Sequence, residues 1–380
     1  YQYRFMKKLI SSMIVAGMAI TGMSLTSCSQ KVDAEPTLKE AFKDNFLMGV
    51  AVNADQVAGT DSIGKAIVAK HFNSIVAENV MKCEKIHPQE NEYFWDDADA
   101  FVNFGEENNM FIIGHCLIWH SQLAPWFLFD DKGNYVDAET LKQRMRDHIY
   151  TIVGRYKGRV DAWDVVNEAI LEDGSYRNSG FYEILGEEFI PLAFQYAHEA
   201  DPDAELYYND YGMHEQGRRD TVIKMVNDMK QRGLRIDGIG MQSHVGIDYP
   251  DFDAYEKSLE AFGGTGCKVM ITEWDMSALP SVTHSANVGD TIAQAENQNP
   301  YPDGLPANVA QEWNDRMEMM MDMLVKHSDV VSRVTAWGLS DRDTWRNDWP
   351  IHGRTDYPLL FDRNHEMKPF LNKYLAQEKK

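Results

Sequence analysis

Short runs of apolar and β-branched residues alternate with longer stretches of helical periodicity along most of the chain. Two helical patterns are clear, over residues 140–156 and 218–233, and the second ends on Gly233, as helices commonly do. Eight of the apolar runs have the length and composition of strands. They cover residues 46–52, 71–79, 110–119, 159–169, 204–211, 236–245, 268–274 and 333–341.

The eight β-then-α units predict an α/β fold of one domain. Strands that are apolar almost throughout are typical of a parallel sheet buried on both faces, and eight of them close into a (β/α)8 TIM barrel. A doubly wound open sheet is the alternative fold, but it requires a glycine-rich phosphate turn after the first strand, and residues 50–59 lack one. Since no Pro/Ser-rich linker divides the body, residues 38–375 are predicted to form the catalytic domain.

The first 27 residues have the features of an export signal. Basic residues follow Met6, an apolar core covers residues 9–25, and small residues precede Cys28. The sequence "LTSC" resembles a bacterial lipobox, which implies cleavage before Cys28 and a lipid on that cysteine. Residues 28–37 then form a short tether. We expect the protein to be exported and held by this lipid to the outer membrane of a Gram-negative cell, on its periplasmic or surface face.

The chain is strongly acidic, which limits its partners. Its formal charge is −22, and without the three basic residues of the leader it is −25. Such a surface repels phosphate backbones, so nucleic acid is not expected as a partner. The membrane is expected to be contacted only through the lipid on Cys28, and a neutral ligand fits the composition better.

The mature chain keeps three further cysteines, Cys83, Cys116 and Cys267, without C-x-x-C or zinc spacing. An odd number of widely spaced cysteines does not predict a disulfide framework. Buried free thiols are therefore expected, with a Cys83–Cys116 bridge as the alternative.

Polar residues gather where the predicted strands end. In a barrel the carboxyl ends of all strands meet at one mouth, which is where TIM-barrel enzymes have their active sites. The candidate site is therefore formed by Glu78, Asn79, His115, Trp119, His120, Asn167, Glu168, Asn209, Asp210, Gln242, His244, Glu273, Asp275 and Trp337.

Two of these carboxylates, Glu168 and Glu273, each end an apolar strand and suggest glycoside hydrolysis. In that reaction one acid protonates the leaving oxygen, and the other attacks the anomeric carbon or activates water. Tryptophans near the same strand ends suit the apolar faces of sugar rings, although core packing is the usual role of a tryptophan. The histidines lack a metal-binding spacing such as H-E-x-x-H, so neither a metal nor a cofactor is expected.

The motifs "DVVNEA", "ITEWD", "GHCLIWHSQLAPW", "FNSIVAENVMKCE", "LYYNDY", "GIGMQSH" and "WGLSDRDTW" resemble those of glycoside hydrolase family 10, the endo-β-1,4-xylanases. The likeness runs in order from about Leu38 to Lys373. It implies a retaining double displacement in xylan, with Glu168 as acid/base and Glu273 as nucleophile. It also implies that Asn167 binds a sugar hydroxyl beside the nucleophile, and that His244, linked to Asp275, contacts the nucleophile.

The resemblance further implies which side chains bind xylan or a xylo-oligosaccharide, the expected partner of an enzyme that we expect to be a monomer. The residues that would bind the reacting sugar are Lys82, His115, Trp119 and Trp337. Those that would bind the next sugar are Glu78, Asn79, Gln122 and Trp345. The leaving group would meet Tyr208 and Asn209.

Four residues depart from the pattern of the family: Cys83, Ile113, Cys116 and Trp274. None of them removes a catalytic group, but they alter the packing behind the inner subsites. The stretch from Ser277 to Asn308 is longer than in many members, and a βα loop at this place lies on the catalytic face.

Three other functions remain open at this point. A β-1,4-glucanase or mannanase on a related barrel would use the same two carboxylates. A surface lipoprotein that binds glycans without cutting them would keep the aromatic side chains but lack the acids. A metal-dependent hydrolase would lose its activity when a chelator is added.

Overall fold

The structure, a computed structural model, describes residues 35–280, 299–349 and 351–377. From Pro36 onward the chain forms one compact unit. The expected leader, Cys28 and most of the stretch from Ser277 to Asn308 lie outside the described residues.

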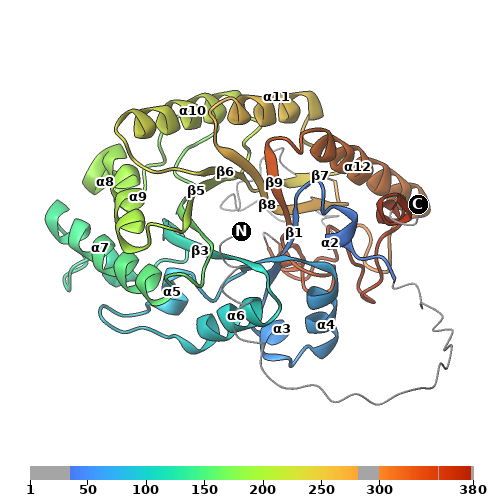
Figure 1. Cartoon of the computed structure of the whole chain (residues 1–380), viewed down its shortest axis with the longest axis horizontal. Coiled ribbons are helices and arrows are strands. Elements are labelled where there is room, and N and C mark those ends of the chain that lie inside the picture. The colour runs from blue at the N-terminus through green and yellow to red at the C-terminus, as the bar shows by residue number, and fades with distance from the viewer. Residues whose placement is uncertain (1–34, 281–298, 350, 378–380) are drawn as a thin grey trace, which may run out of the picture. The chain divides into compact units, whose positions relative to one another are not determined.

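The strands form a closed parallel barrel, as predicted (Figure 1). β1 pairs with both β2 and β9, and the ring closes through the pairing of β6 with β8. The strands are β1 (Leu47–Val52), β2 (Ser74–Ala77), β3 (Phe111–Trp119), β4 (Ala162–Asn167), β5 (Glu205–Asp210), β6 (Gly238–Met241), β7 (His244–Gly246), β8 (Lys268–Ser277) and β9 (Val331–Ala336).

One predicted strand, over residues 236–245, is divided in two. β6 ends at Met241 and pairs with β5 and β8, whereas β7 begins at His244 and pairs only with the outer part of β8. The break lies at Ser243, whose φ of +65° is left-handed and cannot continue a strand. This break lets the chain turn at the mouth of the barrel before His244.

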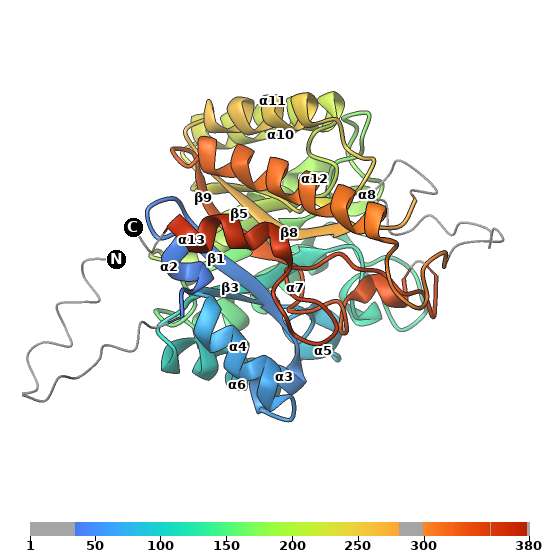
Figure 2. The same ribbon diagram turned by 90° about the vertical axis from the view of Figure 1, so that its right-hand side faces the viewer.

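Helices surround the ring on its outside, as Figures 1 and 2 show. The predicted helices over 140–156 and 218–233 are α7 and α10, and Gly233, with a φ of +72°, follows the end of α10. The α-helices are α2 (Leu38–Ala41), α3 (Ala54–Ala58), α4 (Ser62–His71), α5 (Cys83–Ile86), α6 (Asp96–Glu107), α7 (Ala138–Arg155), α8 (Gly180–Leu185), α9 (Phe189–Ala200), α10 (Gln216–Gln231), α11 (Phe252–Gly263), α12 (Ala307–Lys326) and α13 (Asn372–Gln377). Short 3-10 turns cover Pro125–Phe127, Gly186–Glu188, Trp345–Asn347 and Pro369–Leu371.

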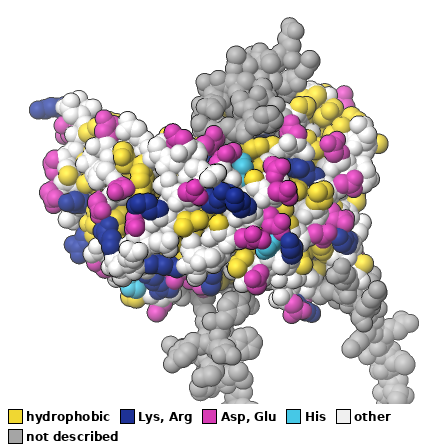
Figure 3. Space-filling model, turned by 90° about the horizontal axis from the view of Figure 1, so that it is seen from above, with side chains coloured by type: hydrophobic (Ala, Val, Ile, Leu, Met, Phe, Trp, Pro, Cys, Tyr) yellow, Lys and Arg dark blue, Asp and Glu magenta, His cyan; other side chains and the backbone are white. Residues whose placement is uncertain are grey.

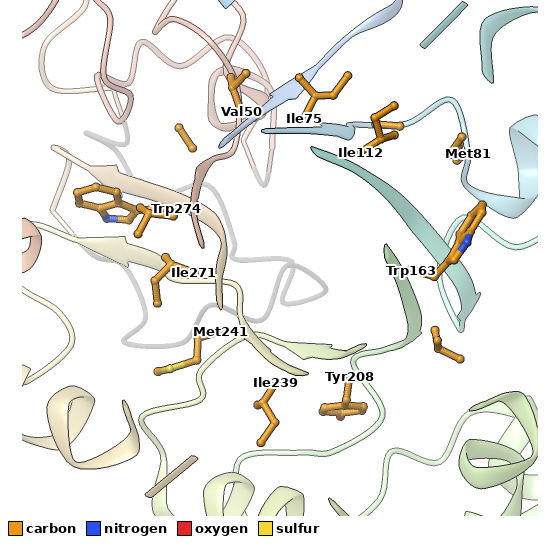
Figure 4. Close-up of a cluster of buried hydrophobic side chains, with 14 of the residues drawn as sticks. Val50, Ile75, Met81, Ile112, Trp163, Tyr208, Ile239, Met241, Ile271 and Trp274 are labelled. Carbon is orange, nitrogen blue, oxygen red and sulfur yellow. The ribbon is translucent and has the colours of Figure 1, made fainter. Parts of the chain in front are cut away.

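The core has two layers because side chains alternate along each strand. One set points outward to the helices, and Figure 4 shows several of its members around the ring. The other set fills the interior of the barrel and consists of Ala51, Val76, Ile113, Ala162, Tyr207, Met270 and Trp337. The interior is therefore packed, so ligands are confined to the mouth.

The surface matches the acidic composition. In Figure 3 the Asp and Glu side chains are spread over one face and are interspersed with Lys and Arg. A surface of this kind favours solubility and a neutral ligand over a polyanion.

Candidate active site

Glu168 directly follows β4, and its backbone is left-handed with a φ of +58°. Two contacts fix this conformation: the Glu168 N–H donates to the carbonyl of Asn209 (2.9 Å), and the Glu168 carbonyl accepts from Nε of Arg177 (2.8 Å). A left-handed residue with a side chain costs on the order of 1 kcal/mol and persists only where its surroundings determine it. Asn167 and Glu168 consequently both reach Gln242 at the mouth, which regular strand alternation would prevent.

The Glu168 carboxyl group receives one neutral donor at each oxygen. Nε1 of Trp119, at the end of β3, donates to Oε2 (2.9 Å), and Nε2 of Gln242, just after β6, donates to Oε1 (3.0 Å). Neither donor carries a charge. The side chain is partly exposed at the mouth, where it can meet a ligand.

Glu273 lies within β8 and is 5% exposed. Nδ2 of Asn209 donates to its Oε1 (2.8 Å), and Nε2 of His244 donates to its Oε2 (3.0 Å). Burial alone would raise the pKa of Glu273, but the His244 hydrogen bond and the charges of His115 and His244 outweigh it and leave that pKa below its usual value. Glu273 is therefore held as an anion.

His244 is the cation behind this anion. Its Nδ1 donates to Oδ2 of Asp275 (3.0 Å), so both ring nitrogens are bonded to carboxylates. Burial opposes the charged ring, but Asp275, followed by Glu273, raises the pKa of His244 to about 9. Asp275 in turn accepts from Nε1 of Trp345 (2.7 Å) and Nε of Arg346 (2.8 Å). The sequence prediction that His244 joins Glu273 to Asp275 is confirmed by this geometry.

Asn167 is oriented by a buried amide network. Its Oδ1 accepts from Nδ2 of Asn209 (2.9 Å) and from Nε2 of Gln242 (3.2 Å). Oδ1 of Asn209 accepts from the hydroxyl of Thr272 (2.6 Å), which fixes the amide of Asn209. Both bonds use the oxygen of Asn167, so among the described residues its amide nitrogen is left to donate to a ligand hydroxyl.

On the opposite wall, Lys82 organises several of the predicted ligand-binding residues. Its Nζ donates to Oδ1 of Asn79 (3.0 Å) and to Oε1 of Gln122 (2.8 Å), and it lies 5.0 Å from the centre of the Trp119 ring. Lys82 is buried, whereas Asn79, Gln122 and Trp119 are partly exposed. This arrangement places hydroxyl-binding groups beside an aromatic plane, as a sugar site requires.

His115 and Trp337 form the floor between the two walls. Nδ1 of His115 is bonded to Oδ2 of Asp164 (2.9 Å), and the ring centres of His115 and Trp337 are 5.3 Å apart in an edge-on arrangement. Glu78 follows β2, and burial, opposed by Lys82 and reinforced by the charge of Asp343, raises its pKa to about 7. Glu78 therefore gains or loses its charge near neutral pH.

The structure corrects the prediction that Tyr208 and Asn209 bind the leaving group. Both residues have no exposed surface. Tyr208 points outward into the helix-facing core (Figure 4), and its hydroxyl donates to Asp210 and accepts from the Ala169 N–H. Asn209 points inward but lies beneath Glu273, which it positions. Its neighbour Tyr207 fills the barrel interior, as the alternation of side chains along a strand requires.

The roles of three residues of the site were not predicted from the sequence. Gln242 was placed at the mouth but given no role, although it binds both Asn167 and Glu168. Arg177 and Arg346 lie in loops after β4 and β9, where no periodic pattern marks them. The only sequence signal is their position a few residues beyond a strand-end motif.

The four departures from the family pattern lie in packed positions. Cys83, Cys116 and Trp274 are at most 5% exposed, and Ile113 belongs to the interior layer. The thiols of Cys83, Cys116 and Cys267 are free, as expected, so the alternative of a Cys83–Cys116 bridge is wrong. These residues therefore fill space behind the site and bring no chemistry to it.

His115 and His244 are each bonded to carboxylates within the protein. Within the part of the chain that the structure describes, the groups of three acidic or histidine residues with ligand atoms close together are Asp61–Asp343–His365 and Glu256–Glu260–His327. Neither group includes His115 or His244.

Comparison with known proteins agrees with this geometry. Residues 37–377 match the model of glycosyl hydrolase family 10. The chain is 44% identical to endo-1,4-beta-xylanase A of Xylanibacter ruminicola, over 90% of this chain and 93% of that protein. The solved structure of a family 10 endoxylanase from a sugarcane soil metagenome superposes with a TM-score of 0.86 at 43% identity, covering 90% of this chain and 99% of the other. A variant solved in complex with xylotriose is similar at 32% identity and a TM-score of 0.80, over 89% and 99% of the two chains. The chain therefore belongs to glycosyl hydrolase family 10.

Proposed function

We propose that this chain is an endo-1,4-β-xylanase that cleaves xylan with retention of configuration. The observation that carries the proposal is the contrast between two carboxyl groups at the mouth. Glu273 is bonded to a protonated histidine, whereas Glu168 is bonded only to the neutral donors of Trp119 and Gln242. A carboxylate paired with a cation and a second carboxyl group with neutral partners suit a nucleophile and an acid/base.

In the first step, the Glu273 carboxylate attacks the anomeric carbon. The bond from that carbon to the glycosidic oxygen breaks, and Glu168 gives its proton to the departing oxygen. Direct attack of this kind works where the two carboxyl groups are about 5 to 5.5 Å apart.

In the second step, a water molecule attacks the same carbon and gives its proton to Glu168. Glu273 then leaves as a carboxylate, and the sugar regains its original configuration. Because Glu273 carries no charge while it is bonded to the sugar, Glu168 can act as a base in this step and as an acid in the first.

The contacts of the mouth support a xylan substrate. The amide nitrogen of Asn167 is free to bind a hydroxyl of the reacting sugar beside Glu273. The reacting sugar is assigned to Lys82, His115, Trp119 and Trp337, and the next sugar to Glu78, Asn79, Gln122 and Trp345. Similarity to endo-1,4-beta-xylanases and to a protein that binds xylotriose favours xylan over glucan or mannan.

The experiment is release of reducing sugar from xylan, carboxymethylcellulose and mannan by the chain and by three variants. Glu168→Gln and Glu273→Gln keep size and remove charge, and Glu107→Gln at the exposed end of α6 is the matched control. Release from xylan alone that is lost in the first two variants and kept in the control supports the proposal. Release from carboxymethylcellulose or mannan instead would favour a glucanase or mannanase, and binding without release would favour a glycan-binding lipoprotein.

We also propose that the protein is exported and carries a lipid on Cys28, as the leader and the "LTSC" sequence suggest. Among the described residues, no helix has the length and apolar character needed to cross a membrane. Incorporation of labelled palmitate in a bacterial host tests the proposal. Labelling of the native chain and none in Cys28→Ala is expected, and equal labelling of both would contradict it.

A further inference from the structure

Three segments distant in the sequence meet beside the mouth of the barrel. Asp61 precedes α4, Asp343 follows β9, and His365 lies in the turn before the Pro369–Leu371 helix. One ligand atom of each lies within 4.8 Å of the other two. The cluster thus joins the first βα connection to the last one and to the C-terminal segment.

His365 has a nitrogen that its own chain leaves unbonded. Nε2 is buried, and among the described residues it has no hydrogen-bond partner. The backbone is held in the left-handed region, with a φ of +64°, and its N–H donates to the carbonyl of Asp362 (3.0 Å). A buried ring nitrogen without a partner is uncommon in native proteins and points to a ligand that is not part of the chain.

The two aspartates bring like charges together with little compensation. Oδ1 of Asp61 accepts from the Gly64 N–H (2.9 Å), which caps α4. Asp343 is paired with Arg342, whose Nε is 4.0 Å away and whose side chain is 66% exposed. A bound cation would relieve this repulsion.

The second group, formed by Glu256, Glu260 and His327, provides a contrast. Oε1 of Glu256 is 2.7 Å from Nζ of Lys326 and 2.7 Å from Nε2 of His327. That group therefore already contains its cation within the chain, and its histidine is bonded. In the Asp61 group, by contrast, Nε2 of the histidine has no hydrogen-bond partner among the described residues.

We propose that Asp61, Asp343 and His365 bind a divalent transition-metal ion, with Zn²⁺ as the preferred ion. One imidazole nitrogen and two carboxylate oxygens are ligands that Zn²⁺ accepts, whereas Ca²⁺ and Mg²⁺ are bound by oxygen ligands. Water completes the coordination, because the Asp343 side chain is 30% exposed. The sequence reasoning expected no metal, since it considered only the histidines at the strand ends.

The ion would act as a cross-link rather than in the reaction. It would tie the loop before α4 to the loop after β9 and to the C-terminal segment, and so brace the place where the first and last units of the barrel meet. An ion that binds the folded but not the unfolded chain raises the unfolding temperature with its concentration.

The test uses the full chain without an affinity tag, after treatment with a chelator. Calorimetric titration with Zn²⁺, Mn²⁺ and Ca²⁺ measures binding, and the unfolding temperature is measured in the presence of each ion. Asp343→Asn removes one ligand charge, and His365→Asn removes the ring while keeping a residue type that accepts a positive φ. His327→Asn, in the contrasting group, and His352→Asn, whose side chain is 91% exposed, are matched controls.

We expect Zn²⁺ binding that raises the unfolding temperature of the native chain and of both controls. In Asp343→Asn and His365→Asn, binding should weaken by at least roughly tenfold and the rise should disappear. Asp61→Asn, which can still cap α4 through its amide oxygen, should behave like these two variants. The proposal is overturned if Zn²⁺ does not bind, or if it binds the ligand variants as tightly as the controls; circular dichroism establishes that each variant is folded.

Discussion

Nε2 of His244 lies 3.0 Å from Oε2 of Glu273, and its Nδ1 lies 3.0 Å from Oδ2 of Asp275. The ring thus connects the nucleophile to a second buried anion, which is itself bonded to Arg346. Positive and negative groups alternate along this chain of contacts. The alternation explains how an anion as buried as Glu273 remains ionised.

The first prediction concerns the charge of His244. Its pKa of about 9 exceeds the ordinary value of 6.5, so its stabilising effect is fully present below pH 6.5 and is lost as the pH rises through 9. Asp275 contributes most to the rise, and Asp275→Asn should therefore lower the pKa of His244 more than Glu273→Gln does. NMR titration of the histidine rings measures both shifts. Equal shifts in the two variants would contradict the assigned order of causes.

The second prediction concerns a pair of buried histidines next to the wall that carries Lys82. Nδ1 of His87 is 2.8 Å from Nδ1 of His148, and Nε2 of His148 donates to the carbonyl of Leu117 (3.1 Å). Burial lowers the pKa of His87 to about 4. Burial, with the charge of His87, lowers that of His148 to about 3. Both rings are therefore neutral in the folded protein at pH 6.

Because the unfolded chain takes up these protons at a higher pH than the folded one, stability should fall as the pH drops from 6.5 toward 4. The loss is on the order of 2 to 3 kcal/mol for His87 alone. His87→Gln should reduce this dependence, whereas the exposed control His352→Gln should retain it. Denaturant unfolding between pH 4 and 7 measures the slopes, and identical slopes in His87→Gln and the native chain would refute the prediction.

The third prediction concerns Arg177, which we regard as a positioning residue. Its Nε holds the carbonyl of Glu168, and its Nη2 donates to the hydroxyl of Tyr211 (2.7 Å). Arg177→Met should release the left-handed turn at Glu168 and lower kcat by about 10- to 100-fold with little change in KM. Tyr211→Phe, which removes only the support of Arg177, should cause a smaller loss.

Arg232→Met is the control, because Arg232 lies on the surface and pairs with the exposed Glu188 instead of with a residue of the site. Steady-state kinetics on xylan give kcat and KM separately. A rise in KM with unchanged kcat in Arg177→Met would show that the residue contacts substrate rather than positions Glu168.

The fourth prediction separates two neighbours in β5. Asn209→Ala removes the donor to Oε1 of Glu273 and should lower kcat by about 100-fold. Tyr208→Phe removes a buried hydroxyl that is bonded to Asp210 and to the Ala169 N–H, and should cost about 1 to 2 kcal/mol of stability. Its KM should stay unchanged. Kinetics combined with denaturant unfolding distinguishes these outcomes, and a raised KM in Tyr208→Phe would restore it as a ligand contact.

Much of the fold could be predicted because burial on both faces leaves a continuous apolar pattern in each strand. The eight strand positions and the convergence of Glu168, Glu273 and His244 followed from that pattern and from the closure of the barrel. The division between β6 and β7 did not, because it depends on one left-handed residue, Ser243, in an otherwise regular run.

The site was predicted less completely than the fold. Tyr208 was assigned to the ligand because its neighbours match a motif, although strand alternation turns it toward the helices. Arg177 and Arg346 act through contacts with a backbone carbonyl and a buried carboxylate, and such contacts leave no periodic trace in a sequence. Residues on loops require the folded path of the chain before their partners can be named.

The pairing of β1 with β9 also bears on how the protein is made. Leu47 lies opposite Arg333, so β1 has no neighbour on one side until β9 has been synthesised. Until then its unpaired edge can join other chains. Closure of the ring joins strands that are far apart in the sequence, and contacts of this kind slow folding and prolong the exposure of the edge.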